Sequence, residues 1–323
     1  MSLPCLKQDK ISASTIFGFL WMKINHFVFN FFIFLWLSQN VDAATLSLPL
    51  WPNSATLAPS NEQFTINKHG AIEHINSPQL WVYCPKQSNH IAILVISGGG
   101  YAREELAKES TPTAQFLQEQ GFTVFELIYR LPNQDGNNLL VPFEDGQRAL
   151  RIIRYHANQF NIDPDKIGVL GFSAGGHLAG IIATQWQQQF SSLNDPIDQI
   201  SAQPNFVALL YPIISMQAPL DHTHAYKSLF GSKHDLAKQI LFSVDLQVKQ
   251  NTPPTFLAHA IDDPISPVQN SLNMQPALQQ HKIAYELHLF KNGGHGWGLG
   301  KANTETTQWP TLFLTWLKKI DIL

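Results

Sequence analysis

Short apolar runs alternate with segments of helical periodicity from residue 78 onward, and no other sequence feature constrains the fold as strongly. Several runs, such as Ile91–Ile96 and Phe206–Tyr211, are apolar throughout, which is typical of strands covered on both faces. Strands that alternate with helices form a mainly parallel central sheet with helices on both faces, so the sequence predicts an α/β fold. The predicted strands are Leu80–Tyr83, Ile91–Ile96, Thr123–Tyr129, Ile167–Leu170, Phe206–Tyr211, Thr255–His259 and Tyr285–Phe290.

The helical segments and the chain length indicate one large domain. A chain of 323 residues, 44% of them hydrophobic, can bury a substantial core, and no repeat or low-complexity linker divides it. We therefore expect a single domain over residues 44–323. Residues 215–251 are irregular and form either a lid over a site or an ordinary surface insertion. The predicted helices are 144–159, 174–186, 268–280 and 305–319.

Residues 1–43 have the pattern of a secretory signal peptide, with a basic residue before an apolar run and a small residue at the end. The apolar run covers residues 24–37, whereas a membrane-spanning helix needs about 20 residues. Cleavage after Ala43 is therefore favoured over an uncleaved anchor, and translation starts at Met1 or Met22. We expect an exported bacterial protein, periplasmic or secreted, without a stable membrane anchor.

The charge balance excludes several classes of function. The chain has 21 Lys and Arg against 24 Asp and Glu, a net charge of -3, and no basic run. A nucleic-acid partner is not expected, because such proteins carry a basic excess. The segment Asp221-His222-Thr223-His224 is similar to a metal-binding sequence, but no further ligands cluster near it, so a loop or lid role is favoured. We expect no metal.

Gly171-Phe172-Ser173-Ala174-Gly175 is a G-x-S-x-G motif placed between a strand-like and a helix-like segment. A nucleophile elbow requires this order, because the sharp turn exposes the serine at the edge of the sheet. The alternative interpretation is a glycine-rich turn with an incidental serine. The order of elements favours Ser173 as a nucleophile.

A second glycine-rich loop, Ser97-Gly98-Gly99-Gly100-Tyr101, follows the strand-like run IAILVI. Backbone N–H groups in such a loop can approach a substrate and stabilise the negative oxygen of a tetrahedral intermediate. We expect Ala174 to supply one N–H donor of this oxyanion hole and Gly99 or Gly100 the other. The alternative is a loop that needs positive φ angles.

A serine hydroxyl becomes nucleophilic when a base takes its proton, and the base needs an orienting carboxylate. His295 lies in a glycine-flanked loop after the last predicted strand, from which it can reach the carboxyl edge of the sheet. Asp263 follows the strand TFLAHA, and Pro264 begins a rigid turn that can fix its carboxylate. Asp262 is the competitor. The predicted triad is therefore Ser173, Asp263 and His295.

Other residues near these motifs receive structural interpretations or a place in a pocket. Tyr101 and Trp297 flank the predicted site, and we expect them to line a substrate pocket, because apolar walls with a polar group suit sugars and acyl groups. His177 is interpreted as a packing or capping residue of the helix after the elbow. Asp145 and Arg148 have the spacing of an ion pair across one helical turn.

The sequence resembles a family of secreted α/β-hydrolase carbohydrate esterases, the acetyl xylan esterases and feruloyl-esterase-like, xylanase-associated enzymes. The resemblance covers roughly residues 80–300 and implies the α/β-hydrolase fold and ester hydrolysis without a cofactor. It also implies Ser173 as nucleophile, Asp263 as acid, His295 as base, and Gly99, Gly100 and Ala174 as the oxyanion hole. Ser97 departs from the family, in which Pro or His commonly precedes the glycines. The strings that carry the resemblance are SGGGY, KES, YRLP, DGQRALRIIR, NIDPDKIGVLGFSAGGHLAG, YPIIS, TPPTFLAHAIDDPISP and GGHGWGLG.

The expected activity is hydrolysis of short acyl esters through an acyl-enzyme, with acetate on a plant polysaccharide or oligosaccharide as the favoured substrate. One alternative is a serine peptidase or amidase on the same scaffold. The other is a binding module on a hydrolase scaffold that has lost catalysis. Such modules usually lack one of the three triad side chains, and this sequence contains all three.

Overall fold

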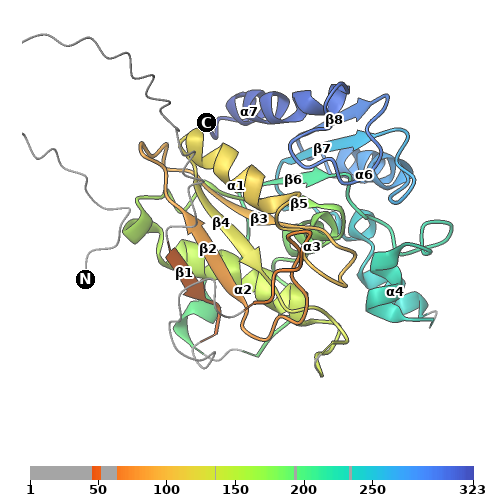
Figure 1. Ribbon diagram of the computed structural model, residues 1–323, viewed down its shortest axis with the longest axis horizontal. Helices are drawn as coiled ribbons and strands as arrows, with labels where there is room; N and C mark the ends of the chain where they lie inside the picture. Colours follow the sequence, from red (N-terminus) through yellow and green to blue (C-terminus); the bar gives the residue numbers. More distant parts are fainter. Residues whose placement is uncertain (1–45, 52–63, 135, 193–194, 233–234) are drawn as a thin grey trace, which may run out of the picture.

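The computed structural model describes residues 46–51, 64–134, 136–192, 195–232 and 235–323 (Figure 1). The predicted signal segment, residues 1–43, lies outside the described residues. The elements in chain order are β1 Leu46–Pro49, β2 Gln79–Tyr83, β3 Ala92–Ile96, α1 Ser110–Glu119, β4 Thr123–Ile128, α2 Val141–Tyr155, η1 Ala157–Phe160, β5 Ile167–Phe172, α3 Ser173–Thr184, η2 Pro196–Gln199, β6 Phe206–Leu210, α4 His224–Phe230, α5 Leu236–Leu241, η3 Val244–Gln247, β7 Thr255–Ala260, α6 Gln269–Gln280, β8 Tyr285–Phe290, η4 Glu305–Gln308 and α7 Trp309–Lys319.

The described strands form one sheet of eight in the order β1-β2-β4-β3-β5-β6-β7-β8. The six strands from β4 to β8 in this order are parallel. β1 and β2 form an antiparallel edge, in which β1 pairs with β2 and β2 pairs with β4. The prediction of a mainly parallel sheet is confirmed, and β1 is an addition that the sequence did not predict.

Helices cover both faces of the sheet (Figure 1). α1 and α7 pack on one face, and α2, α3 and α6 pack on the other. Because both faces are covered, every residue of β3, β5 and β7 is buried, which explains their continuous apolar sequences. No helix in the described ranges has the length and apolar character to cross a bilayer.

The chain reverses its direction of travel across the sheet at β3. It runs from β3 through α1 to β4 on one side, and then through α2 to β5 on the other side of β3. The connections after β3 and β5 therefore leave in opposite directions, and a crevice opens at the carboxyl ends of these two strands. The glycine loop follows β3 and Ser173 follows β5, so this crevice brings the two predicted motifs together.

The predicted ion pair between Asp145 and Arg148 is wrong. Asp145 instead binds the guanidinium of Arg130, with its Oδ1 2.7 Å from Nη2. Arg148 instead binds the carboxylates of Asp195 at 2.6 Å and Asp198 at 2.8 Å. Each ion pair thus ties α2 to a neighbouring segment: Arg130, after β4, binds Asp145 of α2, and Arg148 of α2 binds Asp195 before η2. A guanidinium group has five N–H donors, so it needs more acceptors than one partner in the same helix supplies.

Candidate active site

Ser173 stands on a sharp turn between β5 and α3. Its φ angle of 52° lies in the left-handed region that residues with a side chain rarely adopt. The glycines of the motif are required by space. A Cβ at Gly171 would collide with the carbonyl oxygen of Gly175, and a Cβ at Gly175 would collide with the carbonyl oxygens of Ile96 and Ser97. The motif therefore holds the serine at the end of β5, against the end of β3.

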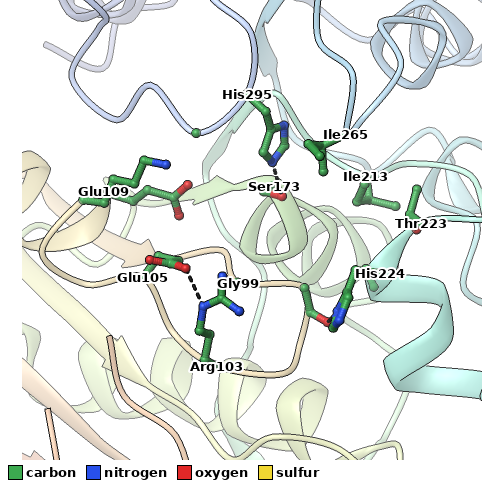
Figure 2. Close-up of a pocket in the computed structure, with 14 residues that line it drawn as sticks. Gly99, Arg103, Glu105, Glu109, Ser173, Ile213, Thr223, His224, Ile265 and His295 are labelled. Carbon is green, nitrogen blue, oxygen red and sulfur yellow. Dashed lines mark hydrogen bonds and ion pairs between the residues drawn. The ribbon is translucent and has the colours of Figure 1, made fainter. Parts of the chain in front are cut away.

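The structure brings the three predicted triad side chains together (Figure 2). His295 Nε2 lies 2.8 Å from Ser173 Oγ, and His295 Nδ1 lies 2.7 Å from Asp263 Oδ2. Burial raises the pKa of Asp263, but hydrogen bonds from His259, His295 and Ser266 outweigh it and lower the pKa to about 2. Asp263 is therefore ionised near neutral pH and accepts the Nδ1 proton, which leaves the Nε2 lone pair facing Ser173.

Backbone amides decide which of the two neighbouring aspartates reaches the histidine. Asp263 Oδ1 accepts N–H groups from Ile265 at 2.8 Å and Ser266 at 2.9 Å, and this orients Oδ2 toward His295. The competitor, Asp262, instead accepts the N–H groups at the start of the His295 loop, from residues 293 and 294. Asp262 therefore holds the loop, and Asp263 contacts the imidazole.

A cavity of 270 Å³ opens beside Ser173 and His295. Gly99 and Gly100 line it, and within the described residues their N–H groups donate no backbone hydrogen bond. Ala174 lies in the first turn of α3, where an N–H group has no intrahelical acceptor. In the described part of the chain, these amides have no backbone acceptor of their own, and their role as an oxyanion hole stays a prediction.

The other walls of the cavity come from two further segments. Thr223, His224 and Ala225, at the start of α4, line one side, and they belong to the irregular segment for which a lid over a site was one of the two expectations. Four charged residues line another side: Arg103, Glu105, Lys108 and Glu109. Glu109 belongs to the string KES, which is one of the strings that carry the family resemblance but was given no function. This string is the sequence signal that could have pointed to Glu109.

The expectation that Tyr101 and Trp297 line the pocket is wrong. Tyr101 is fully buried, and its hydroxyl lies 2.7 Å from Nδ1 of His177, whose Nε2 donates to the carbonyl of Phe242. Trp297 is 6% exposed and packs on Tyr211 with the ring centroids 4.4 Å apart. Both aromatic residues therefore belong to the core beneath the site.

The donors at the site suit acid–base and nucleophilic chemistry. Across the described ranges, no group of three His, Cys, Asp or Glu side chains is arranged to hold a metal ion. A hydroxyl, an imidazole and an ionised carboxylate in hydrogen-bonding order can move a proton from Ser173 to His295 as the serine attacks a carbonyl carbon. The adjoining N–H groups can then bind the developing oxyanion.

The mainly parallel sheet, the serine turn after β5 and the loops after β7 and β8 define the α/β-hydrolase class. Within this class, residues 80–278 match the BD-FAE family. The chain therefore belongs to the BD-FAE family, and the predicted resemblance to an α/β-hydrolase esterase family is confirmed.

Similar proteins include an acetylxylan esterase of Xylanibacter ruminicola, 28% identical over 81% of this chain and 52% of the relative. An endo-1,4-beta-xylanase B of Butyrivibrio fibrisolvens is 34% identical over 71% of this chain and 35% of the relative. The chain thus spans about half and about a third of these two curated relatives.

A crystal structure of an acetyl ester-xyloside bifunctional hydrolase from Caldicellulosiruptor lactoaceticus has a TM-score of 0.73 and 34% identity, covering 88% of this chain and all of that one. The carboxylesterase Cest-2923 from Lactobacillus plantarum, at 24% identity and a TM-score of 0.65, supports the fold alone.

Proposed function

We propose that this protein is a serine esterase that hydrolyses short acyl esters, with acetate as the acyl group, on plant polysaccharides or oligosaccharides. The observation that carries this proposal is the unbroken chain of hydrogen bonds from Ser173 through His295 to Asp263 beside an open cavity. Ser173 attacks the ester carbonyl and His295 takes its proton. The alcohol leaves, and water then releases the acid from the acyl-enzyme.

The size and lining of the cavity support a short acyl group. The cavity measures 270 Å³, and its apolar contacts come from Ile213, Ala225 and Ile265. His224 closes one side, because a Cβ at Gly100 would lie only 2.7 Å from its Nδ1. A cavity of this size accommodates a short acyl group such as acetyl.

A second, polar cavity supports a large, hydroxyl-rich alcohol. This cavity of 720 Å³ adjoins the first, since Arg103, Glu105 and Lys108 line both. Its far side carries polar residues of the segment before β2, among them Asn67 and Glu73. Such side chains can exchange hydrogen bonds with sugar hydroxyls in place of water. The names of the acetylxylan esterase and of the acetyl ester-xyloside bifunctional hydrolase, both similar to this chain, agree with this substrate class.

The test compares acetate release from acetylated xylo-oligosaccharides with turnover of p-nitrophenyl acetate, butyrate and octanoate. We expect the activity of the wild type to fall as the acyl chain lengthens. In Ser173→Ala, kcat should fall by about 10⁴-fold or more. Faster cleavage of aminoacyl amides than of acetate esters would favour the peptidase or amidase alternative. A folded protein that neither cleaves these esters nor reacts with a fluorophosphonate would favour the binding module.

We also propose export with removal of residues 1–43, so that one domain over 44–323 works outside the bacterial cytoplasm. The basic residue, the apolar run and the final Ala43 support this proposal. The mass of the protein recovered from the periplasm or the culture medium should correspond to a chain that begins at Ala44. Exported material that keeps residues 24–37 would show an uncleaved anchor instead.

A further inference from the structure

Glu109 is a buried carboxyl group beside the triad that the mechanism above does not use. It is 3% exposed and lines the 270 Å³ cavity with Ser173 and His295. A Cβ at Gly98 would lie 2.9 Å from both Glu109 Oε2 and Ser173 Cβ, so only the missing side chain of a glycine separates the carboxylate from the serine. Figure 2 shows the carboxylate directed into the cavity on the side of Ser173. A buried acidic group at this place needs a reason.

Each carboxylate oxygen of Glu109 holds a different loop of the site. Oε2 accepts the N–H of Gly98 at 2.6 Å, at the start of the glycine loop. Oε1 accepts the hydroxyl of Tyr211 at 3.0 Å, and that hydroxyl in turn accepts the N–H of Gly298 at 3.1 Å, at the end of the His295 loop. Glu109 thus connects the predicted oxyanion loop with the loop of the predicted base.

The same contacts favour the ionised form of Glu109. Because the Tyr211 hydroxyl accepts the N–H of Gly298, its own proton is free to point at Oε1, and Gly98 supplies a donor to Oε2. Burial raises the pKa of Glu109 above its usual value, and Gly98, Tyr211 and the positive form of His295 offset part of this rise. Tyr211 contacts both groups, because its hydroxyl donates to Glu109 and its ring lies edge-on to the imidazole of His295 with a centroid distance of 4.9 Å.

We propose that Glu109 is a positioning residue of the reaction, which fixes the glycine loop relative to the His295 loop and whose negative charge stabilises the imidazolium formed when Ser173 attacks. The proposal rests on the esterase function proposed above. It assigns to the site a second carboxylate, which acts through Gly98 and Tyr211 and through its charge. The ionisable groups that face His295 and Glu109 from the packed elements are Asp263, Tyr211, Glu105, Lys108, Arg103 and His224.

The first test is Glu109→Gln, which keeps the shape and one acceptor but removes the charge. With p-nitrophenyl acetate we expect kcat to fall about 10- to 100-fold, less than the loss of a direct oxyanion donor, with little change in KM. The acid limb of the kcat/KM profile should move to lower pH by about half a unit or more, because a protonated base loses a nearby negative charge. A merely structural role would leave this limb in place.

Two further variants separate charge from tether and serve if the first one does not fold. Glu109→Asp keeps the charge and should return the acid limb to the wild-type position while kcat stays low. Tyr211→Phe keeps the ring but removes the hydroxyl, so kcat should fall while the acid limb does not move. A folded Tyr211→Phe with wild-type kcat would refute the tether. A folded Glu109→Gln with wild-type kcat and acid limb would refute the whole proposal.

A matched control is Glu126→Gln, which neutralises another fully buried carboxyl. Glu126 accepts hydroxyl groups from Tyr83, Ser110 and Thr111 at 2.6 to 2.7 Å, away from the cavity. This variant should lose thermal stability and keep the kcat and the acid limb of the wild type. The proposed function fails separately, if the wild type does not release acetate or if Ser173→Ala does. If the wild type is active, Ser173→Ala is inactive and Glu109→Gln has the kcat and acid limb of the wild type, the Glu109 proposal is refuted and the proposed function is not.

Discussion

Asp263→Asn is the substitution whose effect follows most directly from the geometry of the site. Oδ1 accepts the N–H groups of Ile265 and Ser266, so the asparagine carbonyl oxygen must occupy this position. The amide NH₂ then points at His295 Nδ1, where Oδ2 now lies at 2.7 Å. Because an amide donates where the carboxylate accepted, the imidazole must carry its proton on Nε2. Nε2–H faces Ser173 and cannot take its proton.

We expect kcat for p-nitrophenyl acetate to fall about 10⁴-fold at neutral pH, equivalent to about 5 kcal/mol of transition-state stabilisation, with KM almost unchanged. Asp262→Asn is the matched control, because its amide oxygen can still accept the N–H groups of residues 293 and 294. It should retain activity. A kcat for Asp263→Asn within about tenfold of the wild type would refute the tautomer argument.

The same variant has a stability signature whose sign is fixed by the pKa shift. The folded-state pKa of Asp263 is lowered from 3.8 to about 2, so the stabilisation is present above pH 3.8 and is lost as the pH falls through about 2. A shift of this size is worth about 2 kcal/mol at neutral pH. Urea unfolding should show this deficit for Asp263→Asn at pH 7, and a deficit that persists unchanged at pH 2 would contradict the linkage.

Three other substitutions test the framework around the site. Gly175→Ala should cost about 3 kcal/mol or more of unfolding free energy, since its Cβ would overlap the Ser97 carbonyl oxygen; a wild-type urea midpoint would contradict this. Burial lowers the pKa of His177 from 6.5 to about 4, so the wild type should lose about 3 kcal/mol between pH 7 and pH 4. His177→Asn should lack this component of the acid dependence, and equal slopes for the two proteins would be the contrary result. Arg148→Ala removes the guanidinium that binds the buried carboxylate of Asp198 and should cost about 3–5 kcal/mol in urea unfolding; a loss below about 1 kcal/mol would show that the pair is not needed.

The fold elements and site residues that could be predicted from the sequence are those encoded by short local patterns. The strands β3, β5 and β7 are mostly apolar because both faces of the sheet are covered. Such runs can be recognised in the sequence without knowing which elements pack on them. The serine turn is encoded by glycines within five residues, and the chain order of strands then places Asp263 and His295 at the same edge. The geometry of the site could therefore be anticipated from local signals plus the rule for parallel sheets.

The features that could not be predicted from the sequence depend on contacts with residues far away in the chain. The direction of the Tyr101 ring is decided by His177, 76 residues later, and the partner of Arg148 lies 47 residues later in Asp195. Glu109 acquires its place through Gly98 and Tyr211, and neither contact leaves a periodic mark in the sequence. β1 is a four-residue edge strand, too short for its alternation to stand out.

The wall that α4 contributes has a consequence for how this scaffold can change. The reacting groups stand on loops anchored to β5, β7 and β8, whereas Thr223, His224 and Ala225 belong to an excursion between β6 and β7. Replacing this segment with a shorter or differently shaped one would change the shape of the cavity beside Ser173 and leave the positions of the triad side chains unchanged. This part of the wall can therefore change without a change in the loops that carry Ser173, Asp263 and His295, whereas Ile265 lines the cavity from the Asp263 loop itself.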